Sequence, residues 1–269
     1  MKGDFFMFSN NTGTLASEER QLWNKVPQVT IFFWIIKIMA TTVGETAADY
    51  LNFNLNWGLT VTTVAITVLL IIGLFFQISA TKYVPSLYWL AVVLISVVGT
   101  LITDNLVDNL GVSLESATIW FSVALLATFV FWYRSEKTLS IHSITTRKRE
   151  AFYWLTILFT FALGTAAGDL VAESLNMGYL ISAVIFAVII GVISLAHFRF
   201  KLNAVTAFWM AYILTRPLGA SLGDYLSQPR SEGGLELGTT GTSVIFLVII
   251  LVLVLYLTKT KRDQLSAEI

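Results

Sequence analysis

Residues 29–51 read VTIFFWIIKIMATTVGETAADYL, an apolar run long enough to cross the hydrocarbon core of a bilayer as one helix. Similar runs follow between polar loops, near residues 59–77, 86–106, 113–133, 151–172, 179–198, 204–225 and 241–258. The sequence therefore predicts an all-α membrane protein with eight transmembrane helices. A cytoplasmic segment, residues 1–28, is expected before the membrane domain (29–258), and a cytoplasmic tail, residues 259–269, after it.

The composition excludes several classes of protein. Of the 269 residues, 56% are hydrophobic and 13% are charged, whereas soluble domains have about 25% charged residues. Formal net charge is zero, and the longest run of like charges is the RKR at 147–149, so nucleic acid is not an expected partner. The absence of cysteine excludes disulfides and thiolate metal sites. No nucleotide-binding or hydrolase motif occurs, and we expect neither an enzyme nor an organic cofactor.

A four-residue pattern in the first span recurs three more times along the chain. It consists of tryptophan, nine residues, glycine, three residues, a small residue and aspartate, and an aromatic residue precedes each tryptophan. The four copies run over residues 34–49, 89–104, 154–169 and 209–224. The chain is therefore predicted to contain four two-helix repeats, near 29–77, 86–133, 151–198 and 204–258. Because each repeat contains an even number of helices, the repeats should run parallel around an axis along the membrane normal.

The basic residues predict the orientation in the membrane. Lysines and arginines lie in the N-terminal segment, the even-numbered loops and the tail, with Lys37, Arg216 and Arg230 as the exceptions. Since basic loops are held on the cytoplasmic side, both termini should be cytoplasmic. The motif aspartates then lie toward the outer leaflet, and we expect the motif tryptophans to anchor the helices at the cytoplasmic interface.

Glycines recur at a helical spacing in the odd-numbered spans. Small residues four apart let helix backbones approach closely in a membrane. The glycines expected to pack in this way are Gly44, Gly99, Gly164, Gly168, Gly219 and Gly223. The four odd-numbered spans are therefore predicted to form an inner bundle.

Carboxylates gather in the outer half of these same spans. The motif aspartates, at the edge of the small-residue face, are Asp49, Asp104, Asp169 and Asp224. Three further acids lie four residues from a motif aspartate, namely Glu45, Asp108 and Glu173. Intramembrane acids are costly and mark functional sites, although acids in water at the helix ends would instead help to cap the hairpins. Crowded carboxylates need cations or protons between them.

Two basic residues lie within the predicted spans. Arg216 occupies the repeat position that holds Thr41, Ser96 and Phe161 in the other copies. Because Arg216 lies near mid-span, it should pair with an acid or line a water-filled cavity. Its role is either to pair with or gate the substrate, or simply to neutralise a buried carboxylate. Lys37 has two alternatives: charge pairing inside the bundle, or extension of its side chain to the cytoplasmic surface.

Four stretches resemble a known family of bacterial proteins. They are KIMATTVGETAADYL (37–51), GTLITDNLVDNLG (99–111), GTAAGDLVAE (164–173) and TRPLGASLGDYLSQP (215–229). The chain is similar to bacterial multi-pass proteins known only as membrane-anchored proteins of unknown function, from about residue 26 to 258. The resemblance implies the bacterial inner membrane and implies no activity.

The acids therefore carry the functional hypothesis. Oxygen ligands without thiolates favour hard ions such as Mg²⁺, Ca²⁺ and Mn²⁺. We expect a transporter that exchanges a divalent metal ion for protons, with Asp49, Asp104, Asp169 and Asp224 as the metal ligands. The alternatives are a proton-coupled carrier of a small organic solute, and a sensory or scaffolding protein that binds metal for stability alone. The expected partners are the lipid bilayer, a small cation and protons. The sequence also allows a homo-oligomer and does not decide the oligomeric state.

Overall fold

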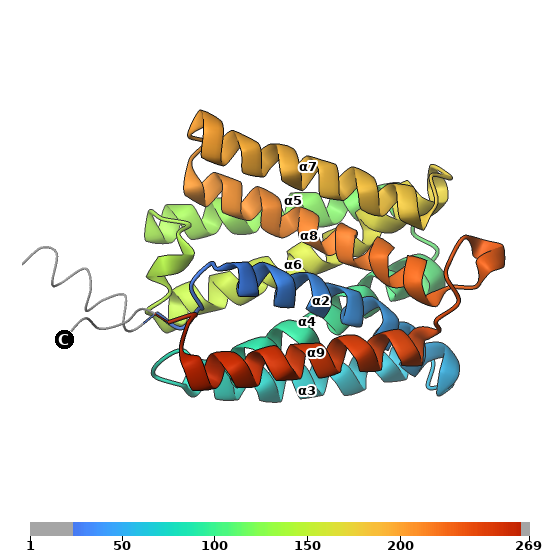
Figure 1. Cartoon of the computed structure of the whole chain (residues 1–269), viewed down its shortest axis with the longest axis horizontal. Helices are drawn as coiled ribbons and strands as arrows, with labels where there is room; N and C mark the ends of the chain where they lie inside the picture. The colour runs from blue at the N-terminus through green and yellow to red at the C-terminus, as the bar shows by residue number, and fades with distance from the viewer. Residues whose placement is uncertain (1–23, 265–269) are drawn as a thin grey trace, which may run out of the picture.

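The computed structural model describes residues 24–264, which form helices and loops without a strand. Its long helices are α2 (Ile31–Asp49), α3 (Leu59–Ser79), α4 (Pro85–Asp104), α5 (Leu114–Glu136), α6 (Arg147–Asp169), α7 (Tyr179–Phe200), α8 (Ala204–Ser227) and α9 (Thr239–Thr260) (Figure 1). The prediction of an all-helical fold with eight long helices is confirmed for this part of the chain. The remainder of the predicted N-terminal segment and tail lies outside the described residues.

The helices identify a multi-pass membrane protein. Seven of them, all except α8, are long and apolar enough to cross a membrane. The exception, α8, is 24 residues long but includes Arg216, Pro217 and Asp224. Large apolar side chains are exposed along α3, α5, α7 and α9, as at Ile71, which is 61% exposed. Such surfaces are expected where helices face lipid.

The first helix of each pair lies inside the molecule and the second lies outside. Helices α2, α4, α6 and α8 form a closed ring, in which each packs on the next and α8 packs on α2. Each outer helix packs on the inner helix of the following pair: α3 on α4, α5 on α6, α7 on α8, and α9 back on α2 (Figure 1). The four helix pairs thus repeat their contacts around one central axis.

Glycines mark the level at which the inner helices cross. A Cβ added to Gly99 would lie 2.6 Å from the Cβ of Phe161 on α6. The equivalent contacts pair Gly44 with Ser96, Gly164 with Arg216 and Gly219 with Thr41. Four residues further along α6 and α8, the contacts are looser. A Cβ added to Gly168 would lie 3.5 Å from Pro217 of α8, and one added to Gly223 would lie 3.3 Å from Glu45 of α2. A side chain at the crossing glycines would therefore force the inner ring apart.

Aromatic residues close the ring at a second level. Each motif tryptophan packs on the aromatic residue that precedes the tryptophan of the previous repeat, with ring centroids 5.5 to 6.2 Å apart. The pairs are Phe33–Trp89, Tyr88–Trp154, Tyr153–Trp209 and Phe208–Trp34. Three of the four tryptophans are buried, Trp34 being the exception. The prediction of interfacial anchors is wrong, because these rings fill the space between inner helices.

Both termini of the described chain lie at one end of the bundle. The backbone amide of Lys25 donates to the carbonyl of Ile144 in the α5–α6 loop. The amide of Gln28 donates to the carbonyl of Asp263, whose carboxylate accepts from the Tyr83 hydroxyl in the α3–α4 loop. We call this the terminus end. The α2–α3, α4–α5, α6–α7 and α8–α9 loops lie at the opposite end (Figure 1).

Candidate functional site

Three of the motif aspartates stand where the helix changes type. Helices α2, α4 and α6 end at Asp49, Asp104 and Asp169, and each continues into a five-residue π-helical turn. These turns are Tyr50–Asn54, Asn105–Asn109 and Leu170–Ser174. Helix α8 continues past Asp224 without such a turn. Because π-turns are rare and frequently mark functional sites, their recurrence beside the motif acids singles out this end of the inner ring.

The motif carboxylates line one pocket at this end, with a volume of about 310 Å³. The three further acids predicted from the sequence, Glu45, Asp108 and Glu173, line the same pocket. The seven predicted acids, from all four repeats, therefore share one cavity.

The pocket wall repeats around the axis in two layers. The first layer is formed by the motif aspartates. The second layer is formed by the residues four positions later, which are Phe53, Asp108, Glu173 and Gln228. Gln228 donates a hydrogen bond of 3.2 Å from Nε2 to Oδ2 of Asp49, and so links the two layers. The fourth repeat thus contributes a neutral amide where the second and third contribute carboxylates.

Sequence reasoning missed three residues of the pocket that have polar side chains and lie outside the repeated positions, namely Asn52, Tyr179 and Glu232. Tyr179 is the first residue of α7, and Glu232 lies in a short helical turn, Arg230–Glu232, that follows α8. None of the three belongs to the repeated motif. Their only signal in the sequence was their place in odd-numbered loops, on the side where the acids were expected.

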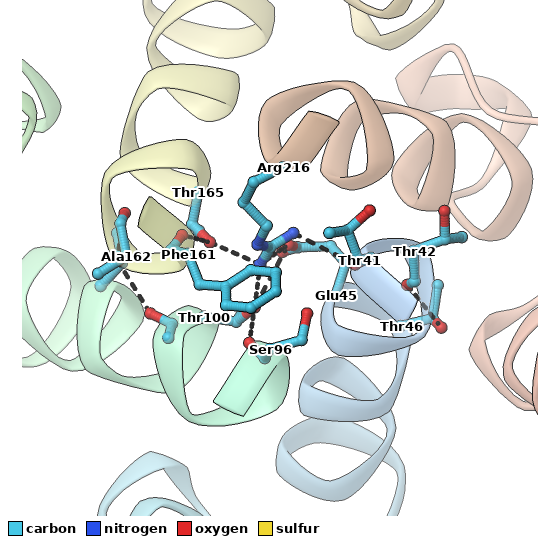
Figure 2. Close-up of polar contacts among 12 residues, drawn as sticks. Thr41, Thr42, Glu45, Thr46, Ser96, Thr100, Phe161, Ala162, Thr165 and Arg216 are labelled. Carbon is cyan, nitrogen blue, oxygen red and sulfur yellow. Dashed lines mark hydrogen bonds and ion pairs between the residues drawn. The ribbon is translucent and has the colours of Figure 1, made fainter. Parts of the chain in front are cut away.

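Arg216 lies behind Glu45, a residue of the pocket wall. Its Nη2 donates to Oε2 of Glu45 at 2.9 Å, to the hydroxyl of Thr165 at 2.6 Å and to the hydroxyl of Thr100. Its Nη1 donates to the carbonyl of Thr41 at 3.3 Å. The side chain is fully buried and touches all three other inner helices (Figure 2). The guanidinium therefore lies near the axis of the ring.

The ion pair between Arg216 and Glu45 joins the pocket wall to the buried interior of the inner ring. Glu45 both lines the pocket and accepts from Arg216, and it is the only acid of the described chain within salt-bridge distance of this guanidinium. Arginine stays protonated in proteins, so the pair cannot be released by deprotonating it. A cation that enters the pocket competes with Arg216 for Glu45.

Lys37 lies deeper in the bundle, eight residues or roughly 12 Å before Glu45 on α2. Its Nζ donates to the hydroxyl of Thr215 at 3.2 Å and lies 4.5 Å and 4.2 Å from the ring centroids of Phe161 and Tyr212. The residue is fully buried, so the alternative of extension to the surface is wrong, because this side of α2 faces α6 and α8. Within residues 24–264, no carboxylate lies within salt-bridge distance of Lys37.

The carboxylates surround the pocket rather than meeting at one point. Among the described residues, no group of three or more His, Asp or Glu side chains lies close enough to hold a metal ion. The expected direct ligation of one ion by Asp49, Asp104, Asp169 and Asp224 is therefore not formed in this arrangement. A dehydrated ion would require these side chains to move inward.

Comparison with known proteins identifies the repeat. A family model described as Repeat of Unknown Function (DUF347) matches the chain four times, at residues 32–83, 87–138, 152–203 and 207–263. Each match contains one inner and one outer helix, so the four predicted repeats are confirmed. No curated protein and no solved structure matches the chain.

Proposed function

Because this chain belongs to the family of the Repeat of Unknown Function (DUF347), whose name assigns no activity, we propose its function from the acidic pocket: it is a membrane transporter that exchanges a cation for protons. One observation carries the proposal. Eight carboxylates from four repeats line one pocket, and one of them, Glu45, also forms an ion pair with the buried Arg216. Buried acids at this density require positive charge, which a cation or protons supply.

The proposed topology has eight membrane-crossing helices, α8 included. Arg216 and Asp224 make α8 less apolar, yet both are buried inside the ring, so they do not face lipid. The terminus end carries most of the basic loop residues and is placed in the cytoplasm. The acidic pocket then opens on the outer side, and the bacterial inner membrane is the proposed location.

The shape of the pocket favours a divalent ion that keeps its water. Oxygen ligands select hard cations, and Mg²⁺ in particular sheds its water reluctantly. A volume of about 310 Å³ accommodates a hydrated ion, and dispersed carboxylates can reach such an ion through its water. We therefore propose an ion of the Mg²⁺ or Mn²⁺ type as the substrate. Protons replace it on the carboxylates when it leaves, as metal binding to acids generally releases protons.

Arg216 acts as an internal substitute for the substrate in this proposal. In the empty pocket it neutralises Glu45, a residue of the pocket wall. A cation that binds Glu45 displaces the guanidinium and so opens the interior toward Lys37.

An organic cation is the second candidate substrate. Phe53 and Tyr179 add aromatic surface to the pocket wall, and aromatic faces bind organic ammonium groups. The pocket volume, about 310 Å³, lies at the lower end of the range for small-molecule sites, roughly 300–1,000 Å³. A compact ammonium compound would fit, whereas a larger solute would not.

Ligand-dependent stability tests the site. The unfolding temperature of the detergent-purified protein is measured with Mn²⁺, Mg²⁺, Ca²⁺, Zn²⁺ and tetramethylammonium at pH 6 and pH 8, for wild type and Asp104→Asn. A ligand at 100 times its Kd stabilises the folded state by about 2.7 kcal/mol. We expect this shift for Mn²⁺ or Mg²⁺, larger at pH 8 and absent in Asp104→Asn. Glu115→Gln, an exposed acid at the start of α5 outside the pocket, is the matched control and should keep the shift.

Flux in proteoliposomes then separates the candidate functions. Uptake of the stabilising ion together with outward proton movement supports the exchanger. A shift with tetramethylammonium alone favours the organic cation. Binding without flux favours a sensory or scaffolding protein, and no shift with any ligand refutes the proposed site.

A further inference from the structure

A second cavity enters the bundle from the terminus end. It has a volume of about 540 Å³ and lies between α2, α7, α8 and the α5–α6 loop. Most of its wall is apolar and includes the rings of Trp34, Phe198 and Phe208. Its deepest residue along α8 is Thr215, halfway through that helix. The cavity shares no lining residue with the acidic pocket, so the two are separate sites.

One repeat earlier, the equivalent place is filled by aromatic rings. Trp132 of α5 is fully buried and stacks on Phe152 of α6, with ring centroids 6.3 Å apart. Its ring also lies 5.8 Å from that of Trp209, the motif tryptophan of α8, and Phe129 lies 5.1 Å from the same tryptophan. An indole and two phenyl rings therefore fill the groove where α5 meets α6 and α8.

At the second cavity these three rings are replaced by small or polar side chains. Helix α7 packs on α8 as α5 packs on α6, so the two grooves are equivalent. A shift of 65 residues relates the second match to the third, and a shift of 55 relates the start of the third to that of the fourth. By these shifts Ser194 replaces Phe129, His197 replaces Trp132 and Ala207 replaces Phe152. All three replacements line the cavity. The cavity therefore lies in the space that aromatic side chains fill one repeat earlier.

The other outer helices bury the residue at the position of His197. The equivalent residues are Gln77 of α3, Trp132 of α5 and Leu257 of α9, and each is at most 1% exposed. Gln77 Nε2 donates to Oε1 of Glu150 at 3.3 Å, so a polar side chain is also satisfied there. His197, by contrast, is only half-buried. The repeat thus provides four equivalent grooves, and the groove of α7 is the one left open.

His197 brings a hydrogen-bond acceptor to the wall of the cavity. Its Nδ1 lies 2.8 Å from the backbone oxygen of Leu202, which can only accept, so Nδ1 carries the hydrogen. In a neutral imidazole the other nitrogen, Nε2, is then an acceptor, and none of the described residues hydrogen-bonds to it. The lining residues include no Asp, Glu, Lys or Arg within residues 24–264. The wall therefore suits a neutral ligand that donates one hydrogen bond.

We propose that this cavity binds a neutral, flat aromatic compound that carries an N–H or O–H donor. Its ring lies in the space equivalent to that of the Trp132 indole, against Trp34, the motif tryptophan in the place of Trp209. Its donor bonds to Nε2 of His197. Apolar cavities in other proteins bind simple aromatic rings in this way. A lipid chain suits the site less well because it would leave the acceptor of His197 without a partner.

Binding of 5-fluoroindole to the detergent-purified protein tests the proposal. The fluorine resonance of the probe broadens when it binds, and only the broadening that excess indole removes is counted, which corrects for uptake by detergent. His197→Trp introduces the side chain that the second repeat has at this position. We expect it to weaken specific binding at least tenfold and to keep the unfolding temperature of wild type. Val192→Trp, at a position of α7 that is 60% exposed and outside the cavity, is the matched control and should bind like wild type.

Two further variants separate the shape of the cavity from its acceptor. Ala207→Phe restores on α8 the ring that Phe152 provides on α6, and it covers the case in which His197→Trp fails to fold. It should also weaken binding at least tenfold. Benzothiophene has the shape of indole but no N–H donor. The preference of wild type for indole over benzothiophene should fall about fivefold in His197→Phe, because one hydrogen bond is lost.

Three results would overturn the proposal. The first is that wild type shows no specific binding, or that both cavity-filling variants bind the probe like wild type. The second is a phospholipid that mass spectrometry finds on wild type and not on His197→Trp, without probe binding, since a lipid chain then occupies the cavity. The third is binding that appears only after Phe5, Phe6 and Phe8 are changed to serine, which would assign the cavity to the N-terminal segment of the chain. Loss of the metal-dependent shift with retained probe binding would refute the proposed cation exchange alone.

Discussion

Replacing Glu45 with glutamine removes one charge from the middle of the inner ring while preserving the size of the side chain. Arg216 would keep the neutral oxygens of Thr41, Thr100 and Thr165 as acceptors but would lose its only carboxylate partner. The guanidinium is fully buried, and water cannot compensate for the lost charge. We therefore expect Glu45→Gln to destabilise the protein strongly.

The geometry sets the size of the effect. For charges 2.9 Å apart and an effective dielectric constant of 20, the Coulomb attraction is about 6 kcal/mol. Desolvation offsets part of this attraction, and breaking one side of a buried pair costs about 3–5 kcal/mol in other proteins. Glu45 is 8% exposed at the side chain, so screening reduces the figure little. At about 2–4 °C per kcal/mol, the unfolding temperature should fall by roughly 10 °C.

A double-mutant cycle isolates the ion pair from other effects of the substitutions. Thermal unfolding of wild type, Glu45→Gln, Arg216→Met and the double variant is followed by tryptophan fluorescence in detergent without divalent cations. The double variant leaves no unpaired charge, so it should be at least about 2 kcal/mol more stable than the sum of the single effects predicts. Additive effects would show that the pair contributes no coupling, and would refute the proposed role of Arg216 as the internal substitute for the substrate.

Three further predictions concern packing, pH and the repeat. Gly99→Ala places a Cβ 2.6 Å from a side chain of α6 and should cost about 1–3 kcal/mol in thermal unfolding. The control Gly191→Ala has no atom within 4 Å of its Cβ and should not destabilise, and equal losses would contradict the glycine crossing. Burial raises the pKa of Asp263, so ionisation of this carboxyl destabilises the folded protein. The stability that the protonated carboxyl provides is complete below the ordinary pKa of 3.8 and is lost as pH rises through the raised value. Asp263→Asn should therefore gain stability relative to wild type between pH 4 and pH 8, and a constant difference would count against this. Adding Ser96→Arg to Arg216→Ser moves the guanidinium to the equivalent position on α4. The double variant should recover part of the unfolding temperature that Arg216→Ser loses. No recovery would show that the inner ring is less symmetric than its contacts indicate.

The helices and the repeat could be predicted because their causes are local. An apolar run of fixed length predicts a membrane span, and a gapless recurrence predicts equivalent helices. The gathering of seven acids also follows, because equivalent positions on parallel helices reach the same level around an axis. Phe53 and Gln228 occupy repeat positions of this pocket as well, but they carry no charge that would draw attention to them.

The partners of individual side chains could not be predicted from one sequence. Whether Lys37 reaches the surface depends on how α2 is rotated relative to α6 and α8, and spacing along one helix does not fix that rotation. The rotations of α4 and α6 likewise turn Trp89 and Trp154 into the bundle, although tryptophans at helix ends are usually interfacial. Arg216 was expected to meet an acid, but several acids stood at suitable distances along the chain. Its pairing with Glu45 follows from the three-dimensional crossing of α8 and α2.

Departures from the repeat gather where the four copies converge. The motif tryptophans and the crossing glycines contact the neighbouring repeat in the same way around the ring, so each can stay the same in every copy. Near the axis, equivalent side chains meet one another. Four guanidinium groups could not occupy that space together, because their like charges would repel. One Arg216 therefore faces the equivalent residues of the other repeats, Glu45, Thr100 and Thr165. The asymmetry gives the ring one ion pair at its centre, and in the proposed exchange this pair is the element that the cation displaces.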